Sequence, residues 1–160
     1  MTADLNAADL KLVAETAFDP AAAGWTKCRP NPFSDVAGPF WQKQEDGQFL
    51  FGVICAPHTQ NNARVMHGGA LATFCDQALG GTLYQTLSRD REPDAPPVRS
   101  VTVQLNIQFL AAVQPFDFVV ARCRIAKTTR TLVFLDGLAE VGSDVVASLQ
   151  AVFKLVKPLA

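Results

Sequence analysis

A long apolar segment that begins at His67-Gly68-Gly69 and continues to about Leu87 constrains the fold of this chain more than any other stretch. Its residues are apolar on nearly every side of a helical projection, which is typical of a helix buried in a protein core. Because glycine lacks a Cβ, the backbone at Gly68 and Gly69 can approach a ligand closely. The first N–H groups of a helix have no intrahelical acceptor, so we expect the Gly68 N–H to stabilise negative charge on a carbonyl oxygen.

Asp76 is the exception on this apolar helix. A carboxylate in apolar surroundings is costly unless it is paired, protonated or at a wet site. It could simply bond a neighbouring backbone group, but beside His67-Gly68-Gly69 we favour a functional role. Since His67 and Asp76 are separated by roughly 13 Å along a helix, one bound group cannot contact both on the same helix. Two antiparallel copies across a two-fold axis would bring Gly68 of one helix to Asp76 of the other, which predicts a homodimer with two equivalent sites.

Composition excludes several classes of protein. A chain of 160 residues with 49% hydrophobic and 18% charged residues is long enough for one globular domain with surface for an oligomer interface. A net charge of −1 gives no basic field for nucleic acid. The four cysteines form no C-x-x-C pair, so a zinc or redox motif is not expected. No signal peptide or membrane-length apolar segment is present, and we therefore expect a cytoplasmic protein.

The remaining sequence predicts strands on both sides of the helix. Residues 38–45 and 48–56 form an expected hairpin around Asp46-Gly47, and a charged, proline-rich segment follows the helix at 88–97. Apolar and polar residues then alternate from Ser100 to Phe109, which predicts a strand with its apolar face on the helix and its polar face away from it. Three more strands are expected at about 116–127, 130–141 and 144–157, in a four-stranded meander. Ahead of this core, residues 3–17 suggest an amphipathic helix and residues 20–35 a loop. The fold class is α+β, with no repeat and no second domain.

The sequence Asn61…His67-Gly68-Gly69…Asp76 resembles the signature of hotdog-fold acyl-CoA thioesterases of the phenylacetyl-CoA (PaaI-like) type. The resemblance extends over roughly residues 36–157. It implies a hotdog fold, in which a curved antiparallel β-sheet wraps a long central helix, within a single domain over residues 1–160. The segment 1–35 would precede the hotdog core at 36–157. Where the family often has glycine three residues before the histidine, this chain has Arg64.

The resemblance also implies roles for individual residues in thioester hydrolysis. Gly68 would polarise the carbonyl, and Asp76 of the partner subunit would act as general base or nucleophile. Thr102, also from the partner, would hold the attacking water, although the role of an ordinary exposed strand threonine carries nearly equal weight. Asn61 would lie beside His67 near the thioester, with Asn62 as the alternative. His67 would either orient this loop or transfer a proton directly.

Coenzyme A is the expected partner molecule, as part of the substrate rather than as a cofactor. Its phosphates require local positive charge, for which Lys127 and Arg130 on one turn are the first choice and Arg89 a further candidate. Other basic candidates are Arg91, Lys154 and Lys157. Gly69 is assigned to substrate binding beside Gly68. No phosphate-binding glycine loop, G-x-S-x-G sequence or metal-ligand cluster occurs, so we expect neither a metal nor a further cofactor.

Two other functions remain open within the same fold. Hotdog hydratases or dehydratases act on acyl thioesters with a histidine and a carboxylate, and some hotdog proteins bind acyl-CoA without turning it over. A homodimer and a dimer of dimers are both compatible with the sequence. Release of free thiol from a panel of acyl-CoAs would separate hydrolysis from water loss and from binding alone.

Overall fold

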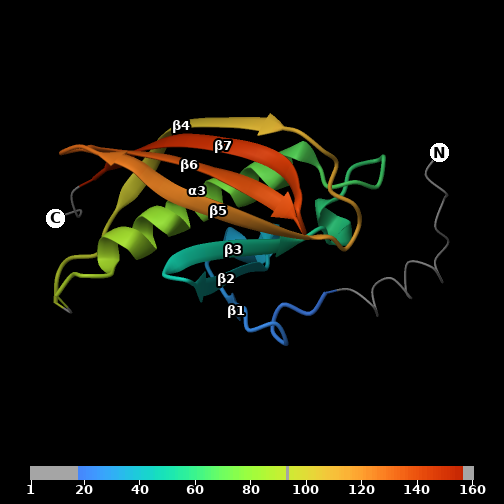
Figure 1. The fold of residues 1–160 in the computed structure, drawn as a ribbon, viewed down its shortest axis with the longest axis horizontal. Helices are drawn as coiled ribbons and strands as arrows, with labels where there is room; N and C mark the ends of the chain where they lie inside the picture. The colour runs from blue at the N-terminus through green and yellow to red at the C-terminus, as the bar shows by residue number, and fades with distance from the viewer. Residues whose placement is uncertain (1–17, 93, 157–160) are drawn as a thin grey trace.

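The computed structural model describes residues 18–156 except residue 93. In this described part of the chain, seven antiparallel strands form one curved sheet, and a single long helix, α3, lies along its inner face (Figure 1). The bounds are β1 (Thr26–Lys27), α2 (Ser34–Ala37), β2 (Phe40–Glu45), β3 (Gln48–Ile54), the 3₁₀ turn η1 (Pro57–Thr59), α3 (Gly68–Ser88), β4 (Ser100–Phe109), β5 (Phe118–Thr128), β6 (Leu132–Val141) and β7 (Asp144–Leu155). This is the predicted α+β class. None of the helices within the described part of the chain combines the length and apolarity needed to cross a membrane.

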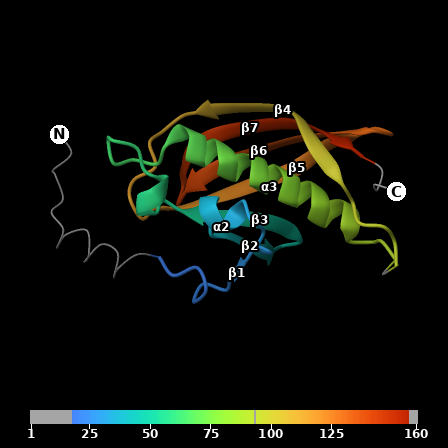
Figure 2. The same ribbon diagram turned by 180° about the vertical axis from the view of Figure 1, so that it is seen from behind.

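The core lies between α3 and the concave face of the sheet. Phe74, Leu79 and Leu83 are fully buried on the helix, and they pack against buried side chains of the strands such as Val119 and Leu149. The opposite face of α3 is only partly buried. The apolar composition of the helix had predicted burial on all sides, so the helix is more open than expected. Figure 2 shows this open face, with β4 along one side of it and β1 and β2 along the other.

The order of strands across the sheet, β1-β2-β3-β5-β6-β7-β4, differs from the expected meander. β5, β6 and β7 do follow one another, but β4 pairs with β7 and β5 pairs with β3. The reason is the position of α3, which carries the chain from β3 across the whole sheet before β4 begins. β4 is therefore an edge strand, with one backbone edge unpaired in the protomer.

A β-bulge between Thr102 and Gln104 changes the faces predicted for β4. Thr102 pairs with Phe153, which is buried under α3, whereas Gln104 pairs with Val152 on the outer face. Since paired residues of neighbouring strands share a face, Thr102 points towards α3 rather than away from it. Strict alternation had predicted that Thr102 faces away from the helix. The extra residue of the bulge, Val103, places Thr102 on the helix-facing side instead.

The apolar side chains of β4 are also less covered than predicted. Ile107 packs against the core, but Val103, Leu105 and Phe109 are 53%, 37% and 53% exposed. α3 is too narrow to cover a strand at the sheet edge as well as the central strands. A row of large apolar side chains is left uncovered on the unpaired edge.

The segment before β2 is more ordered than the loop expected for residues 20–35. β1 adds a short edge strand beside β2, and α2 begins at Ser34. Trp25 packs with Trp41 and Leu50 in a second, smaller cluster. The helix expected at residues 3–17 lies outside the described residues.

Candidate active site

The start of α3 is capped by its own histidine. His67 Nδ1 accepts a hydrogen bond of 2.9 Å from the Gly69 N–H, while the His67 N–H donates to Thr59 O. An accepting Nδ1 carries no proton, so the hydrogen of the neutral imidazole is on Nε2. The cap occupies the N–H of Gly69, and the N–H of Gly68 has no acceptor within the described residues. The Gly68 N–H at the positive end of the helix thus remains available to a ligand.

The two glycines of this turn are needed for different reasons. A Cβ on Gly69 would lie 3.0 Å from His67 Nδ1, a tight contact that a side chain there would relieve only by shifting the capping imidazole. A Cβ on Gly68 would meet only the Phe109 ring, at the ordinary contact distance of 3.7 Å. The protomer therefore has room for a side chain at Gly68, and any requirement for glycine there must come from a ligand or a second subunit.

The loop before α3 is shaped by Asn61. Its Oδ1 accepts hydrogen bonds from the N–H groups of Ala63 at 2.9 Å and Val65 at 3.3 Å, and its backbone N–H donates to Val65 O. Arg64 has a φ of 58°, a left-handed conformation that glycine adopts without strain. Asn61 is half-buried and fixes the loop beside His67, whereas Asn62 is exposed. The side-chain carbonyl oxygen of Asn61 is thus engaged within its own loop.

Asp76 and Thr102 form the second cluster of predicted site residues. The Thr102 Oγ1 donates to Asp76 Oδ1 at 2.9 Å, and both residues come from the same protomer. Asp76 is half-buried on the open face of α3. Because the threonine proton is committed to the carboxylate, the lone pairs of Oγ1 and the second carboxylate oxygen can both accept hydrogen bonds from a water molecule.

A pocket of about 410 Å³ opens beside this pair. Asp76, Gly80 and Tyr84, at four-residue spacing, form its helical floor. The other lining residues come from α3 itself and from elements on both sides of it: Cys28, Arg29, Gln42, Phe51, Gln77, Gly81, Gln85, Ser100, Thr102 and Phe153. Sequence reasoning missed Arg29 and the three glutamines. The spacing of Asp76, Gly80 and Tyr84 was a usable signal, but nothing local indicates that Arg29 lies near them.

The cysteines are poor nucleophiles. Burial raises the pKa of the Cys28 thiol to about 11 and those of Cys75 and Cys123 to about 12. The thiolate, which is the reactive form, is therefore scarce near neutral pH. Within residues 18–156 other than 93, no three His, Cys, Asp or Glu side chains come together as a group that could hold a metal ion.

The two clusters lie apart within one protomer. Gly68 lines a different pocket, of about 360 Å³, together with Met66, Leu71, Phe109 and Leu110. Along α3, Gly68 and Asp76 are separated by roughly 12 Å. One chain therefore does not bring the proposed carbonyl donor to the carboxylate.

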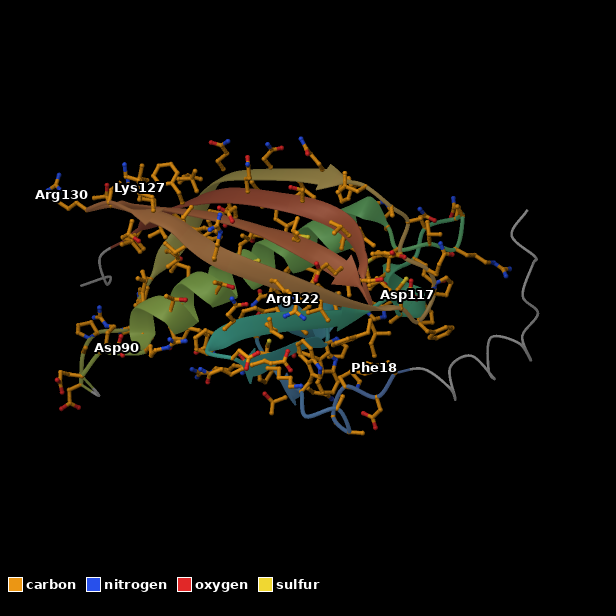
Figure 3. All side chains as sticks on the ribbon, in the orientation of Figure 1. Phe18, Asp90, Asp117, Arg122, Lys127 and Arg130 are labelled. Carbon is orange, nitrogen blue, oxygen red and sulfur yellow. The ribbon has the colours of Figure 1, made fainter. Side chains whose placement is uncertain are left out.

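The predicted phosphate-binding residues separate into two places. Lys127 is the penultimate residue of β5 and Arg130 lies in the turn to β6, and both side chains are exposed at the end of the sheet remote from Asp117 (Figure 3). Arg89 follows α3, where its Nη2 donates to Gly47 O at 2.7 Å and its guanidinium lies 5.1 Å from the Phe49 ring. Arg89 thus ties the end of the helix to the turn between β2 and β3.

Comparison with known proteins finds a related sequence and similar solved structures. The chain is 29% identical over 128 residues to "Putative esterase PA0474" of Pseudomonas aeruginosa, covering 79% of this chain and 90% of that protein. A hypothetical thioesterase from Streptococcus pneumoniae, solved with coenzyme A, superposes with a TM-score of 0.62 at 20% identity, over 76% of this chain and 88% of that chain. A single-residue mutant of the phenylacetic acid degradation protein PaaI from Thermus thermophilus gives a TM-score of 0.63 at 15% identity, over 79% of this chain and 100% of that chain. The likeness to the solved structures shows that this chain has the hotdog fold.

The matched region also contains the elements that carry both clusters. Residues 63–148, which include His67, Gly68, Asp76 and Thr102, match the family described as the thioesterase superfamily. The chain therefore belongs to the thioesterase superfamily.

Proposed function

We propose that this protein is an acyl-CoA thioesterase that hydrolyses an acyl or aryl-acyl thioester to the free acid and coenzyme A. The observation that carries the proposal is the hydrogen-bonded Thr102–Asp76 pair beside an open pocket, in a chain of this superfamily. The similar fold of a thioesterase solved with coenzyme A supports the choice of thioester. No metal ion and no further cofactor takes part in the proposed reaction.

Asp76 acts as the general base in this mechanism. A water molecule bound between Thr102 and Asp76 loses a proton to the carboxylate as its oxygen attacks the thioester carbon. The carbonyl oxygen gains negative charge, which the Gly68 N–H at the helix start stabilises. The C–S bond then breaks, the acid leaves, and the proton goes to the thiolate of coenzyme A. In the variant mechanism the carboxylate attacks first and water hydrolyses the resulting anhydride.

The proposal requires two protomers. Because Gly68 and Asp76 are roughly 12 Å apart along α3, the carbonyl donor and the base of one site must come from different chains. The unpaired edge of β4 and the exposed Val103, Leu105 and Phe109 beside it give a surface for such a homodimer. Two-fold symmetry would then create two equivalent sites, and a dimer of dimers would repeat them.

The other predicted residues have supporting roles in the proposal. Asn61 and His67 hold the loop and the helix cap on the Gly68 side, so that the free N–H keeps its direction. Gly69 permits the cap. Lys127 and Arg130, exposed at the hairpin tip, are proposed to contact the phosphates of coenzyme A, and the engaged guanidinium makes Arg89 a weaker choice.

A thiol-release assay on a panel of acyl-CoAs tests the function. We expect release of free coenzyme A from at least one short, branched or aromatic acyl-CoA, and loss of that release in Asp76→Asn. Water loss from a hydroxyacyl-CoA without thiol release would instead identify a dehydratase. Tight binding in calorimetry with no product would identify a non-catalytic binding protein, and either result would overturn the proposal.

A further inference from the structure

The pocket beside Asp76 has walls from the two opposite edges of the sheet. Ser100 and Thr102 come from β4, whereas Gln42 comes from β2 and Arg29 follows β1. Figure 2 shows these two edges on either side of the open face of α3. Arg29 is placed there because the Cys28 N–H donates to Phe40 O, which continues the pairing of β1 with β2. Arg29 lies outside residues 63–148, the region that matches the family.

The lining of this pocket is unusually polar for a site that receives an acyl group. Pockets for small ligands are usually lined by apolar and aromatic side chains with few polar groups. Here three glutamines contribute amides, and the Gln85 Nε2 donates to Gln42 Oε1 at 3.2 Å, which fixes both side chains on the wall. Tyr84 and Ser100 add hydroxyl groups. A plain hydrocarbon chain would leave these groups without partners, at a cost in binding free energy.

Arg29 supplies positive charge to the same pocket. Among the described residues, none of the ion pairs includes Arg29, although Lys43, Arg122 and Arg124 all have acidic partners. Asp76 in this pocket would repel a negatively charged acyl group, and Arg29 offsets that repulsion. A guanidinium with no acidic partner, beside fixed amides, matches the geometry of a carboxylate, which accepts two parallel hydrogen bonds.

We propose that Arg29 binds a carboxylate carried by the acyl group at the end remote from the thioester. This inference rests on the proposed thioesterase function and narrows its substrates to CoA thioesters of dicarboxylic acids. The carboxylate is placed in the acyl pocket because Arg29 shares that pocket with Asp76, which acts on the thioester carbon. The exposed cations proposed for the phosphates, Lys127 and Arg130, line none of this pocket.

Two probes of equal chain length test the proposal: glutaryl-CoA, with a terminal carboxylate, and pentanoyl-CoA, without one. We expect wild-type kcat/KM to favour glutaryl-CoA. Arg29→Gln should lower kcat/KM for glutaryl-CoA by at least about tenfold, the scale of one hydrogen bond to a charged group, and leave pentanoyl-CoA nearly unchanged. Arg29→Lys should recover part of the loss, because it restores the charge without the planar fork. Arg99→Gln, an exposed arginine of another pocket, is the matched control and should discriminate against neither probe.

Thioesters of pantetheine lack the phosphates of coenzyme A. They therefore show whether Arg29 binds the acyl carboxylate or a phosphate of coenzyme A. The Arg29→Gln effect on the glutaryl thioester should persist with glutaryl-pantetheine. Equal losses for both CoA probes that vanish with pantetheine would make Arg29 a phosphate ligand and overturn the proposal. Equal activity of wild type and Arg29→Gln on glutaryl-CoA would also overturn it.

A binding measurement keeps this result distinct from failure of the thioesterase function. If wild type releases no thiol from any acyl-CoA, the proposed function fails, and calorimetry with intact glutaryl-CoA and pentanoyl-CoA then decides the role of Arg29. Tighter binding of glutaryl-CoA that is lost in Arg29→Gln would retain the carboxylate site. Equal binding of the two thioesters would reject it.

Discussion

Asp76 and Thr102 lie on different elements, and their hydrogen bond holds the carboxylate in one orientation on the open face of α3. Thr102 brings a hydroxyl group next to a carboxylate that would otherwise be free to rotate. If a water molecule is activated there, removal of the Asp76 carboxylate should lower kcat far more than removal of the Thr102 hydroxyl. The two side chains can therefore be ranked by substitution.

We expect Asp76→Asn to lower kcat by about 10²–10⁴-fold with an unchanged melting temperature, since the amide keeps the size and loses the base. Thr102→Val should lower kcat by a smaller factor, and Thr102→Ser should stay near wild type because it keeps the hydroxyl. Thiol release and thermal melting check both, with the exposed Asp94→Asn as control. A near-normal kcat in Asp76→Asn would eliminate it as base and nucleophile.

The glycine pair before the helix gives opposite expectations for two matched variants. Gly69→Ala should disturb the cap and lower stability by about 1 kcal/mol, because its Cβ would lie 3.0 Å from His67 Nδ1. Gly68→Ala should leave the fold intact, since its Cβ has room, but should lower kcat by crowding the thioester oxygen. Chemical denaturation and thiol release measure the two effects. Full activity of a folded Gly68→Ala protein would refute the carbonyl-binding role.

At the scale of secondary structure, periodicity was enough to predict α3 and the strands from β2 to β7. These elements have long patterns with turn residues at their ends, such as Asp46-Gly47 between β2 and β3. The place of β4 could not be predicted in this way, because local patterns do not say which strands pair across a sheet. The two-residue β1 was missed because it forms only by pairing with β2.

Gly80 and Gly81 on α3 show how tightly the helix packs on the sheet. A Cβ on Gly81 would clash with the Phe51 ring, whereas one on Gly80 would lie 3.5 Å from Phe153. We expect Gly81→Ala to lower the free energy of unfolding by about 1–3 kcal/mol through overpacking. Gly80→Ala should preserve or raise it by up to about 1 kcal/mol through helix propensity, and should narrow the acyl pocket.

Urea unfolding and a series of acyl-CoAs of increasing width check this pair of variants. The Gly80→Ala protein should lose activity most with the widest acyl group, because Gly80 lines the pocket. Equal stability of the two variants would show that Phe51 moves aside readily. An unchanged acyl preference in Gly80→Ala would place the acyl group elsewhere.

At the scale of the whole molecule, a site shared between two subunits, as proposed, would make activity recoverable by mixing two inactive variants. Gly68→Val and Asp76→Asn should each be inactive, but refolding them together creates dimers with one site that has both lesions and one that has neither. Random pairing should leave about a quarter of all sites intact, and activity should recover to near that fraction.

The matched control mixes Asp76→Asn with Thr102→Val. Because these two residues lie on the same protomer, every site of a mixed dimer then carries one of the two lesions, and activity should not rise above the mean of the two parent variants. Thiol release after co-refolding, with heterodimers verified by mass, is the measurement. Heterodimers of the first pair that stay inactive would place the whole site within one chain.

The buried thiols should make the free energy of unfolding of the whole molecule depend on pH in the alkaline range. Burial raises the pKa of Cys75 from 9.0 to about 12, so the folded state retains this proton where the unfolded chain loses it. Its contribution is fully present below pH 9 and is lost as the pH rises from there towards 12, by up to about 1.4 kcal/mol per pH unit. The free energy of unfolding of Cys75→Ala should fall less steeply in this range, and parallel profiles would contradict the assignment.

The part of the candidate site that lies on α3 and its N-terminal cap could be predicted from the sequence. Gly68, His67 and Asp76 belong to one continuous pattern, and the structure puts them on a single helix and its cap. Arg29 and Gln42 could not be foreseen, because they reach the pocket from a distant part of the chain. The contact of Thr102 with Asp76 depends on the bulge, which the alternating pattern conceals.

Because of that bulge, the polar residues of β4 face the pocket before Val103 and the outer surface of the sheet after it. Before Val103, the polar positions Ser100 and Thr102 line the pocket, whereas after it the polar positions Gln104, Asn106 and Gln108 pair with outward-facing positions of β7. A single alternating sequence thus supplies hydroxyl groups to the pocket at one end of the strand and amides to the outer face at the other. The number of residues in β4, rather than their polarity, decides whether a hydroxyl group reaches Asp76.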